Sequence, residues 1–406
     1  MSAAAAAATA TRTELVARAG RFPVRLVTTW GAALSVLGAV LVLETLAGPR
    51  AARVWQAWHV NFLFWTGLAQ GLVVFAATLK LAKGHWAGLM IRFAESAAAF
   101  LAVSLALYLG VVWGRAAIFS WLAERRPDLG AWLTSKFFFL RNGLIYLGLT
   151  WLSWRFVRHD LAPDLREVGG GPPADRLEGR DAIARDAALL VVAYAFGYSL
   201  LAFDLMMSLA HKWVSNLFGA FYFMGSFLAA LMALAVGTIV LRRRMGLETL
   251  VSRKQLHDLG KLCFGFTVFW AYLMWAQYLV IWYGNLPEET YFLFYRLIGP
   301  WRPVGVAVFV LVFLLPFVGL LGVKPKQSPP IFLAFALVSL VGIWLERYLE
   351  IVPSINGGAG PALGVPELGV TLLFAGLFLL SLGWFAARYP MLSPRLAADT
   401  LERERH

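Results

Sequence analysis

Two carboxylate residues lie within long apolar stretches of this 406-residue chain and are its first candidates for chemistry, Asp204 and Glu95. A charge at membrane depth is costly, so it usually marks a pathway, a ligand site or a buried pair. Asp204 could accept a proton or hydrogen-bond a quinone head group; otherwise it is a buried acid paired with a cation such as Lys212. Glu95 could serve a proton path or simply pair with Arg92, three residues earlier on the same helix face.

Two histidines stand where apolar stretches begin or end. His59 opens one and His211 closes another, so we expect both near the same membrane surface. A b-type haem needs ligands buried within helices, so contact with a quinol or an interfacial position is the less demanding role. Glu346 and Arg347 are adjacent and point in different directions on a helix, so we expect each to pair with a neighbouring helix.

The segment 281–290 carries a further set of polar and aromatic residues. Tyr283 and the tryptophan before it suit the aromatic belt of a membrane interface. The following glycine, asparagine and proline predict the end of a helix. Glu288 and Glu289 then predict a short interfacial helix reaching Arg296, whose acidic start could face a partner or release protons.

The composition indicates the class of fold that positions these side chains. Apolar residues make up 60% of the chain and charged residues 15%, whereas soluble domains average about 45–50% and 25%. The apolar residues fall into blocks of about twenty, the length needed to cross a hydrocarbon layer of about 30 Å. We therefore predict an all-α, polytopic integral membrane protein.

Ten membrane spans are expected, since unbroken apolar runs exclude the alternation of a β-barrel. A disordered tail over 1–23 precedes them, a tail over 389–406 follows, and the transmembrane domain covers 24–388. The expected spans are 24–46, 59–80, 91–113, 137–157, 187–209, 216–241, 260–283, 303–323, 331–349 and 368–388.

The basic residues set the expected orientation. Counted together with the adjoining helix ends, the alternate segments that include the N-terminus hold 25 Lys and Arg residues. The loops on the opposite side hold 11. This bias predicts that both termini are cytoplasmic. The loop 114–136 runs against the bias, and we expect it to lie along the interface as a short amphipathic helix. The net charge is +13, and the arginines cluster where the apolar blocks end, which favours a membrane-flanking role over nucleic-acid binding.

Sequence motifs exclude several kinds of chemistry within the chain. Cys263 is the only cysteine, so the chain cannot build a disulfide, a c-type haem attachment site or a cysteine-ligated iron-sulfur cluster. No phosphate-binding loop, dinucleotide fingerprint, zinc-protease motif or nucleophile elbow occurs. We expect no metal site, no catalytic residue and no cofactor held by this chain alone, apart from a possible quinol.

Three stretches together resemble the ActF-type membrane subunit of alternative complex III, a bacterial quinol:electron-acceptor oxidoreductase, and the wider NrfD or polysulfide-reductase membrane-subunit family. The stretches are KFFFLRN at 136–142, SLLAFDLMMSL at 199–209 and WYGNLPEE at 282–289. Their order and the ten spans match the family over nearly the whole chain. One departure is Ala210-His211-Lys212-Trp213, where the family commonly has an acidic residue and a proline before its histidine, so a role for His211 does not carry over.

The resemblance implies a fold of two four-helix bundles, about 59–209 and 216–349, flanked by the first and last spans. A short similarity between the openings of the second and sixth spans also suggests such a repeat. Implied partners are a sister NrfD-like membrane subunit, an iron-sulfur and molybdopterin-like peripheral subunit and haem c subunits. The implied surroundings are the lipids of a bacterial cytoplasmic membrane.

The resemblance also implies a role in quinol oxidation and electron transport. The quinol pocket of such complexes looks to belong chiefly to the sister subunit, so this chain is expected to anchor the complex and to conduct protons between Asp204 and Glu95. Two alternatives stay open: a quinol pocket of its own near His59 and Asp204, or an ion-coupled secondary transporter. Transporters usually break helices near the midplane, and here Pro316 is the only proline well inside a span.

Overall fold

The computed structural model describes residues 22–123, 130–172, 175, 178–210, 212–248 and 250–397. The expected tail over 1–23 therefore lies almost wholly outside the described residues. The described helices are α2 (Val24–Leu46), α3 (Ala51–Leu81), α4 (Met90–Glu95), α5 (Ala98–Trp113), α6 (Arg115–Ile118), α7 (Ser135–Val168), α8 (Arg180–Leu205), α9 (Phe218–Met245), α10 (Arg253–Gly284), α11 (Pro287–Leu297), α12 (Arg302–Val308), α13 (Leu315–Gly319), α14 (Val323–Gln327), α15 (Pro329–Ile355) and α16 (Val365–Arg388).

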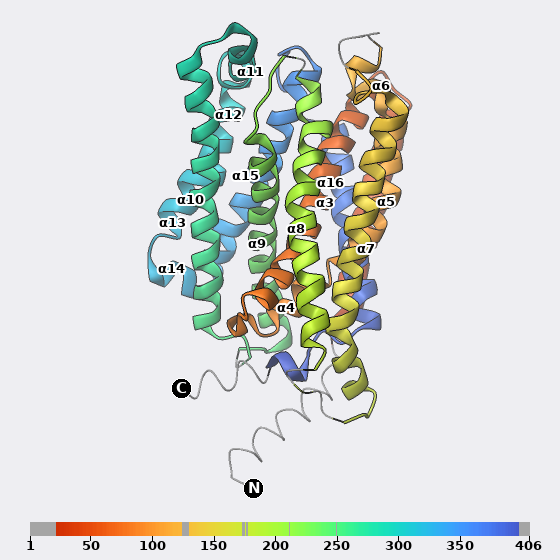
Figure 1. Ribbon diagram of the computed structural model, residues 1–406, viewed down its shortest axis with the longest axis vertical. Coiled ribbons are helices and arrows are strands. Elements are labelled where there is room, and N and C mark those ends of the chain that lie inside the picture. Colours follow the sequence, from red (N-terminus) through yellow and green to blue (C-terminus); the bar gives the residue numbers. More distant parts are fainter. Residues whose placement is uncertain are drawn as a thin grey trace.

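These helices form one upright bundle, and no strand occurs among the described residues (Figure 1). Nine helices or helix groups there are long and apolar enough to cross a membrane. The remaining expected span is α7, which is 34 residues long but interrupts its apolar run with Arg141 and Asn142. The all-α, polytopic membrane fold is thus confirmed, whereas its division into two four-helix bundles stays a prediction.

The two ends of the bundle can be named from α2 and α16. These helices run antiparallel, since Gly31 lies against Leu380 and Gly38 lies against Leu373. The start of α2 and the end of α16 therefore share one end, at the bottom of Figure 1, which we call the lower end. The upper end carries α11 and α6. Which end faces the cytoplasm stays a prediction.

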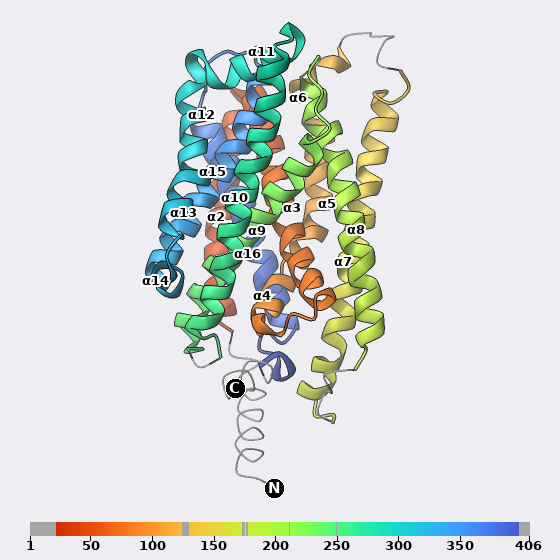
Figure 2. The same ribbon diagram turned by 60° about the vertical axis from the view of Figure 1, so that its left-hand side comes forward.

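Helix α3 is the centre of the bundle. It packs against α5, α8, α9, α15 and α16, and most of its residues are buried. It begins at Ala51, two turns before the expected span, and Figure 2 shows it in the middle of the bundle. A helix buried on all sides requires neighbours on every face, so its polar residues necessarily point into protein.

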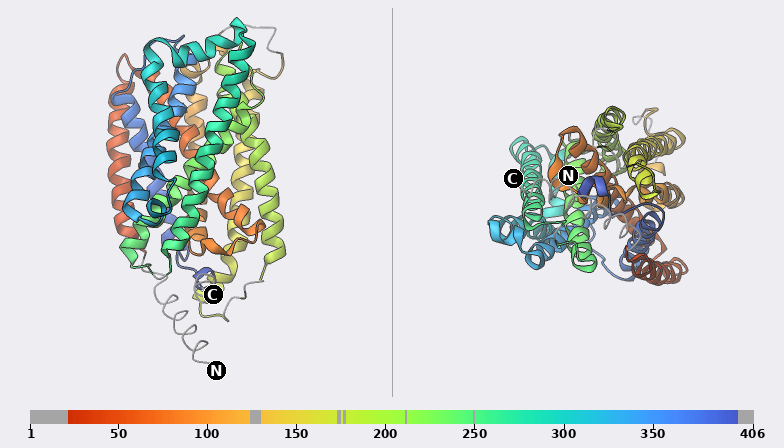
Figure 3. Two further views of the ribbon diagram at one scale, coloured as in Figure 1. Left: turned by 90° about the vertical axis from the view of Figure 1, so that its left-hand side faces the viewer. Right: turned by 90° about the horizontal axis from the view of Figure 1, so that it is seen from below.

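Helix α2 lies at the edge and rests on α16 through glycines (Figure 3). A Cβ at Gly38 would lie 2.3 Å from the Leu373 nitrogen, and one at Gly376 would lie 2.4 Å from the Ser35 nitrogen. Only glycine allows backbones to approach so closely, which is the usual device for helix association in lipid.

Two expected spans are interrupted helices. The span 91–113 is divided into α4 and α5 around Ser96 and Ala97. The span 303–323 contains a π-helix over Phe309–Leu314 between α12 and α13. Pro316, which lacks an N–H and crowds the carbonyl four residues before it, explains why the regular α-helix fails there.

The connections at the upper end differ in how well they were predicted. The short helix expected from Glu288 and Glu289 to Arg296 is confirmed as α11, which runs from Pro287 to Leu297. The amphipathic helix expected over 114–136 is wrong, because its described parts form only the four-residue α6 and a 3-10 turn at Ser120–Leu122. Residues 124–129 of that loop lie outside the described part.

Candidate functional site

Asp204 is buried near the end of α8 and accepts hydrogen bonds from three side chains. Arg141 donates to Oδ2 from Nε at 2.9 Å and from Nη2 at 2.7 Å. Asn142 Nδ2 donates to the same oxygen at 3.0 Å, and Trp132 Nε1 donates to Oδ1 at 3.0 Å. The expected partner Lys212 was therefore wrong; the cation comes from α7, whose Arg141 also lies 3.8 Å from the centroid of the Trp132 ring.

His59 lies two turns inside α3 and is fully buried, so its expected position at a helix start near the surface was wrong. Its Nε2 is 2.7 Å from the carbonyl oxygen of Leu205. A carbonyl only accepts, so Nε2 carries the proton and Nδ1 is a bare acceptor. Among the described residues Nδ1 has no partner, and the residue bonded by Nε2 follows Asp204 directly.

The lower end holds a second buried charge cluster, which joins three cations to three carboxylates from four parts of the chain. Arg92 Nη1 lies 2.8 Å from Glu95 Oε2, as expected from their spacing. The same guanidinium pairs with Asp164 and lies 3.5 Å from Asp160. Lys80 and Arg395 complete the set, at 2.6 and 3.0 Å from Asp160 Oδ1. We call these six residues the lower cluster.

Arg395 shows that the chain after α16 is not a free tail, at least as far as residue 397. Residues 390–397 are buried against the bundle, and Arg395 donates to the carbonyl oxygen of Asp160 at 2.8 Å. Burial alone would lower the pKa of Arg395, but the carboxylates of Asp160 and Asp164 outweigh it and raise that pKa above its ordinary value. Of the tail expected over 389–406, residues 390–397 thus pack against the lower end of the bundle.

A row of buried polar side chains on α7 joins the two charged sites. Its members are Asn142, Tyr146, Ser153, Asp160 and Asp164. At 3.6 residues per turn these positions fall within about 40° of one another around the helix. The row therefore lies on one face of α7 from the Asp204 site to the lower cluster, with buried Leu149 and Phe156 interspersed on that face.

Helix α3 supplies the facing row through His59, Thr66, Gln70 and Lys80, all buried or nearly so. The two rows meet midway, where Gln70 Nε2 donates to Ser153 Oγ at 2.9 Å. Tyr198 of α8 donates to the Thr66 carbonyl oxygen at 3.0 Å. We call the two rows together the polar file.

Several buried atoms along the file lack a partner among the described residues. They are Asn142 Oδ1, His59 Nδ1, Tyr146 Oη and the two Glu95 oxygens, although Glu95 retains its ion pair with Arg92. Unsatisfied buried polar groups are costly, and proteins usually satisfy them with ordered water. Side chains that exchange protons, combined with such water, can pass a proton along a file.

A separate buried pair lies between α9, α10 and α15. Arg347 Nη1 is 3.3 Å from Glu346 Oε1, so the prediction that the two side chains point in different directions was wrong, whereas the expected contacts with neighbouring helices are present. Arg347 Nη2 also donates to the Tyr222 carbonyl oxygen at 3.1 Å, and Trp270 Nε1 donates to Glu346 at 3.4 Å. The ion pair thus connects α9, α10 and α15.

The remaining candidates lie at the surface of the upper end. Tyr283 is 86% exposed at the end of α10, and Glu288 and Glu289 occupy the first turn of α11, where a carboxylate suits the helix dipole. None of the three contacts Asp204 in the structure. His211 lies outside the described residues.

Sequence reasoning missed most partners of the two acids. Asp160 and Asp164 lie beyond the expected span 137–157, because α7 continues about three turns past it. The available signal was the recurrence of polar residues at one helical face from Asn142 to Asp164. Arg395 had no such signal, since its place depends on a chain reversal after α16.

No metal site emerges from these groups. Among the described residues, no cluster of three or more His, Cys, Asp or Glu side chains is arranged to hold a metal ion. The three carboxylates of the lower cluster face Lys80, Arg92 and Arg395 instead. Compared with known proteins, the chain matches no family model and no curated protein.

Proposed function

We propose that this chain is a membrane subunit of a bacterial quinol:electron-acceptor oxidoreductase of the alternative complex III type, and that it conducts protons along the polar file. The observation that carries the proton role is the file itself, which links buried Asp204 to the buried lower cluster across the bundle. The assignment to a respiratory complex rests on the three sequence stretches that resemble that family.

In this proposal the proton-exchanging groups have distinct places. Asp204 exchanges protons with the upper surface, and Glu95 exchanges them with the lower surface. Water bridges the unpartnered atoms of Asn142, His59 and Tyr146 between them. The Gln70–Ser153 hydrogen bond is the part of the file where proton transfer is most restricted, because an amide does not readily take up or release a proton.

The proposed partners carry the redox centres. A sister membrane subunit, an iron-sulfur and molybdopterin-like subunit and haem c subunits would supply quinol oxidation and electron transfer, while this chain anchors them in the cytoplasmic membrane. Affinity-tagged chain purified in mild detergent should bring down a multihaem, iron-sulfur assembly. Purification of the chain alone, active in substrate uptake, would refute the proposal.

The proton role is tested by Asp204→Asn in the assembled complex. We expect changed proton release per quinol oxidised in proteoliposomes, with the quinol KM unchanged. Gln70→Leu should reduce proton movement without removing a charge, which separates conduction from loss of the ion pair. Unchanged turnover and stoichiometry in both variants would contradict a proton path.

One observation favours a second candidate, a quinol pocket in this chain. The bare, buried Nδ1 of His59 is an acceptor suited to a quinol hydroxyl, and Nε2 of the same ring bonds the carbonyl oxygen of Leu205, the residue that follows Asp204. This version expects Asp204→Asn and His59→Phe to raise the quinol KM rather than to change proton stoichiometry.

A third candidate, an ion-coupled transporter, is favoured by the π-helix before Pro316, since interrupted helices often line transport sites. Uptake of a substrate by proteoliposomes that contain this chain alone would identify it.

A further inference from the structure

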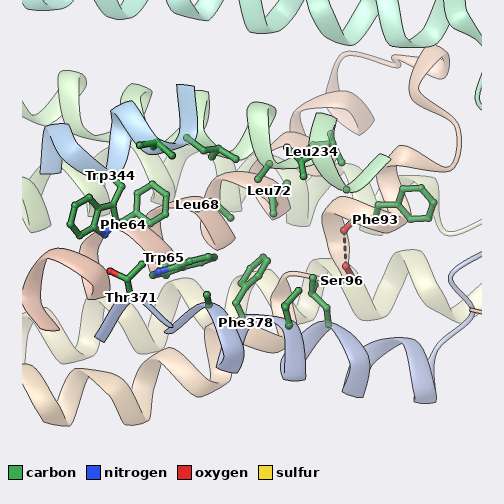
Figure 4. Close-up of a pocket in the computed structure, with 18 of the residues that line it drawn as sticks. Phe64, Trp65, Leu68, Leu72, Phe93, Ser96, Leu234, Trp344, Thr371 and Phe378 are labelled. Carbon is green, nitrogen blue, oxygen red and sulfur yellow. Dashed lines mark hydrogen bonds between the residues drawn. The ribbon is translucent and has the colours of Figure 1, made fainter. Parts of the chain in front are cut away.

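A long groove lies between α16 on one side and α9 and α15 on the other, and part of α3 lines it as well (Figure 4). Its volume is about 680 Å³. The lining residues along α16 run from its N-cap Gly364 to Leu382, at intervals of mostly three or four residues. At 1.5 Å per residue this length is about 27 Å, so the groove crosses most of a bilayer's hydrocarbon layer.

The groove opens sideways and is narrow. Val341 of α15 and Leu368 of α16 line it, and each is more than half exposed. In a membrane-spanning chain, apolar side chains exposed at this depth face lipid tails. A helix about 10 Å in diameter and of the same length would occupy about 2,100 Å³, or about three times the volume of the groove. The groove therefore suits a chain thinner than a helix, and that chain can enter from within the bilayer.

The polar groups of the lining are already used or covered. Ser96 and Thr371 donate their hydroxyl hydrogens to carbonyl oxygens one turn earlier in the chain, at 2.6 and 2.8 Å. Trp344 Nε1 donates to Asn61 Oδ1 at 3.0 Å, and Trp65 Nε1 is buried under other atoms. These side chains leave no hydrogen bond for a polar ring in the groove, so the lining favours a hydrocarbon chain.

The upper end of the groove disfavours an anionic group. Glu367 is the only charged residue among those described that line the groove. Its two carboxylate oxygens accept hydrogen bonds from Arg53 Nε at 3.1 Å and from Arg53 Nη2 at 2.7 Å. The guanidinium is thus already paired, and a phosphate at this end would lie beside a carboxylate.

The lower end of the groove carries positive charge. Helix α9 ends there in three arginines, 242–244. Ala233, Gly237 and Leu241 of α9 line the groove at intervals of four residues. Arg244 is seven residues after Gly237 and three after Leu241, so it continues the same face of α9 by one turn. Arg244 is exposed, and an arginine at the end of a membrane helix reaches head-group depth.

From the hydrocarbon lining and the opposite charges at its two ends, we infer that the groove binds an anionic phospholipid from the leaflet at the lower end of the bundle. The phosphate binds Arg244, because a guanidinium matches phosphate oxygens with parallel hydrogen bonds. An acyl chain then follows Leu241 and Gly237 into the space between α9 and α16. This site does not depend on the respiratory role proposed above.

The test uses the full chain in phosphatidylcholine nanodiscs that contain a trace of phosphatidylglycerol with a diazirine in its acyl chain. Cross-links mapped by mass spectrometry are expected on α9 near Gly237 and on α16 near Leu382. Unlabelled phosphatidylglycerol should halve the labelling at about one-fifth of the mole fraction that phosphatidylethanolamine with the same chains requires. That ratio corresponds to about 1 kcal/mol, the usual contribution of one arginine near an anionic head group.

Two results would overturn the assignment. Equal competition by phosphatidylglycerol and phosphatidylethanolamine would show that the groove does not select an anionic lipid. Stronger competition by menaquinone-4 than by phosphatidylglycerol would assign the groove to a quinone instead.

A pair of arginine variants tests the head-group position. Arg244→Gln should abolish the preference for phosphatidylglycerol over phosphatidylethanolamine. Arg243→Gln removes the same charge from an exposed neighbour that lies about 100° away around α9, off the face of the groove, and it should keep the preference. An equal loss of preference in both variants would refute a site at Arg244.

A pair of glycine variants tests the path of the acyl chain. Gly237 lines the groove, and a Cβ there meets nothing within 4 Å, so Gly237→Phe fills the groove without a backbone clash and should abolish the labelling near Leu382. Gly265→Phe on α10 has the same open surroundings but does not line the groove, and it should label normally. Labelling that survives Gly237→Phe would refute the site.

Discussion

Replacing Arg141 with Gln leaves the buried carboxylate of Asp204 without its cationic partner. Arg141 makes two of the four hydrogen bonds that Asp204 accepts from side chains, at 2.9 and 2.7 Å, and it is the only cation among those donors. Removing one partner of a buried ion pair typically costs about 3–5 kcal/mol, because an uncompensated charge stays behind. We expect Arg141→Gln to lower the free energy of unfolding by that amount.

The double variant Arg141→Gln/Asp204→Asn should be more stable than Arg141→Gln alone, since no buried charge is left without a partner. The coupling between the two positions should be about 2–3 kcal/mol. Reversible unfolding in mixed SDS micelles, followed by circular dichroism, measures all four members of the cycle. Lys212→Gln is the control: Lys212 is exposed, and surface substitutions usually change stability by less than about 0.5 kcal/mol.

A small cost would refute this reasoning. If Arg141→Gln lowered stability by less than about 1 kcal/mol and showed no coupling to Asp204→Asn, the carboxylate would not need its guanidinium partner.

Two further predictions concern the lower end and the edge of the bundle. Arg395→Gln leaves the three carboxylates of the lower cluster with only Lys80 and Arg92. It should lower the free energy of unfolding by about 3 kcal/mol or more and increase protease cleavage after α16. Stability and cleavage equal to wild type would show that Arg395 does not anchor this segment. Gly38→Leu should push α2 away from α16, because its Cβ would lie 2.3 Å from the Leu373 nitrogen; at the control position, Gly48→Leu, the nearest atom is 3.7 Å away. Cross-linking between cysteines placed at Thr28 and Gly383 should fall in Gly38→Leu only. Equal cross-linking in the two variants would contradict the close packing.

The sequence predicted the helices far better than it predicted their polar contacts. The boundaries of α2 match the expected 24–46, because hydrophobic length determines a span almost alone. Contacts between helices depend on rotation about each axis and on which helices are neighbours. Arg141 could therefore not be assigned to Asp204, which lies 63 residues away along the chain.

Predictions from local sequence failed where packing between helices determines the position of a residue. His59 looked like a helix start because the residues before it are less apolar, yet α3 begins eight residues earlier at Ala51. The Glu346–Arg347 pair formed despite adjacency, because long side chains can curve together toward the same buried space. Of the contacts that the sequence predicted, the pair of Arg92 and Glu95 followed the simple helical spacing.

The dependence of α2 on α16 has a consequence for how the protein is made. Helix α2 finds its closest packing partner only when α16, more than 300 residues later in the chain, has been synthesised and inserted. Until then the glycine face of α2 lies against lipid or an insertion chaperone. Chains that stop before residue 365 would leave α2 unplaced, which gives quality-control proteases a means of recognising an unfinished chain.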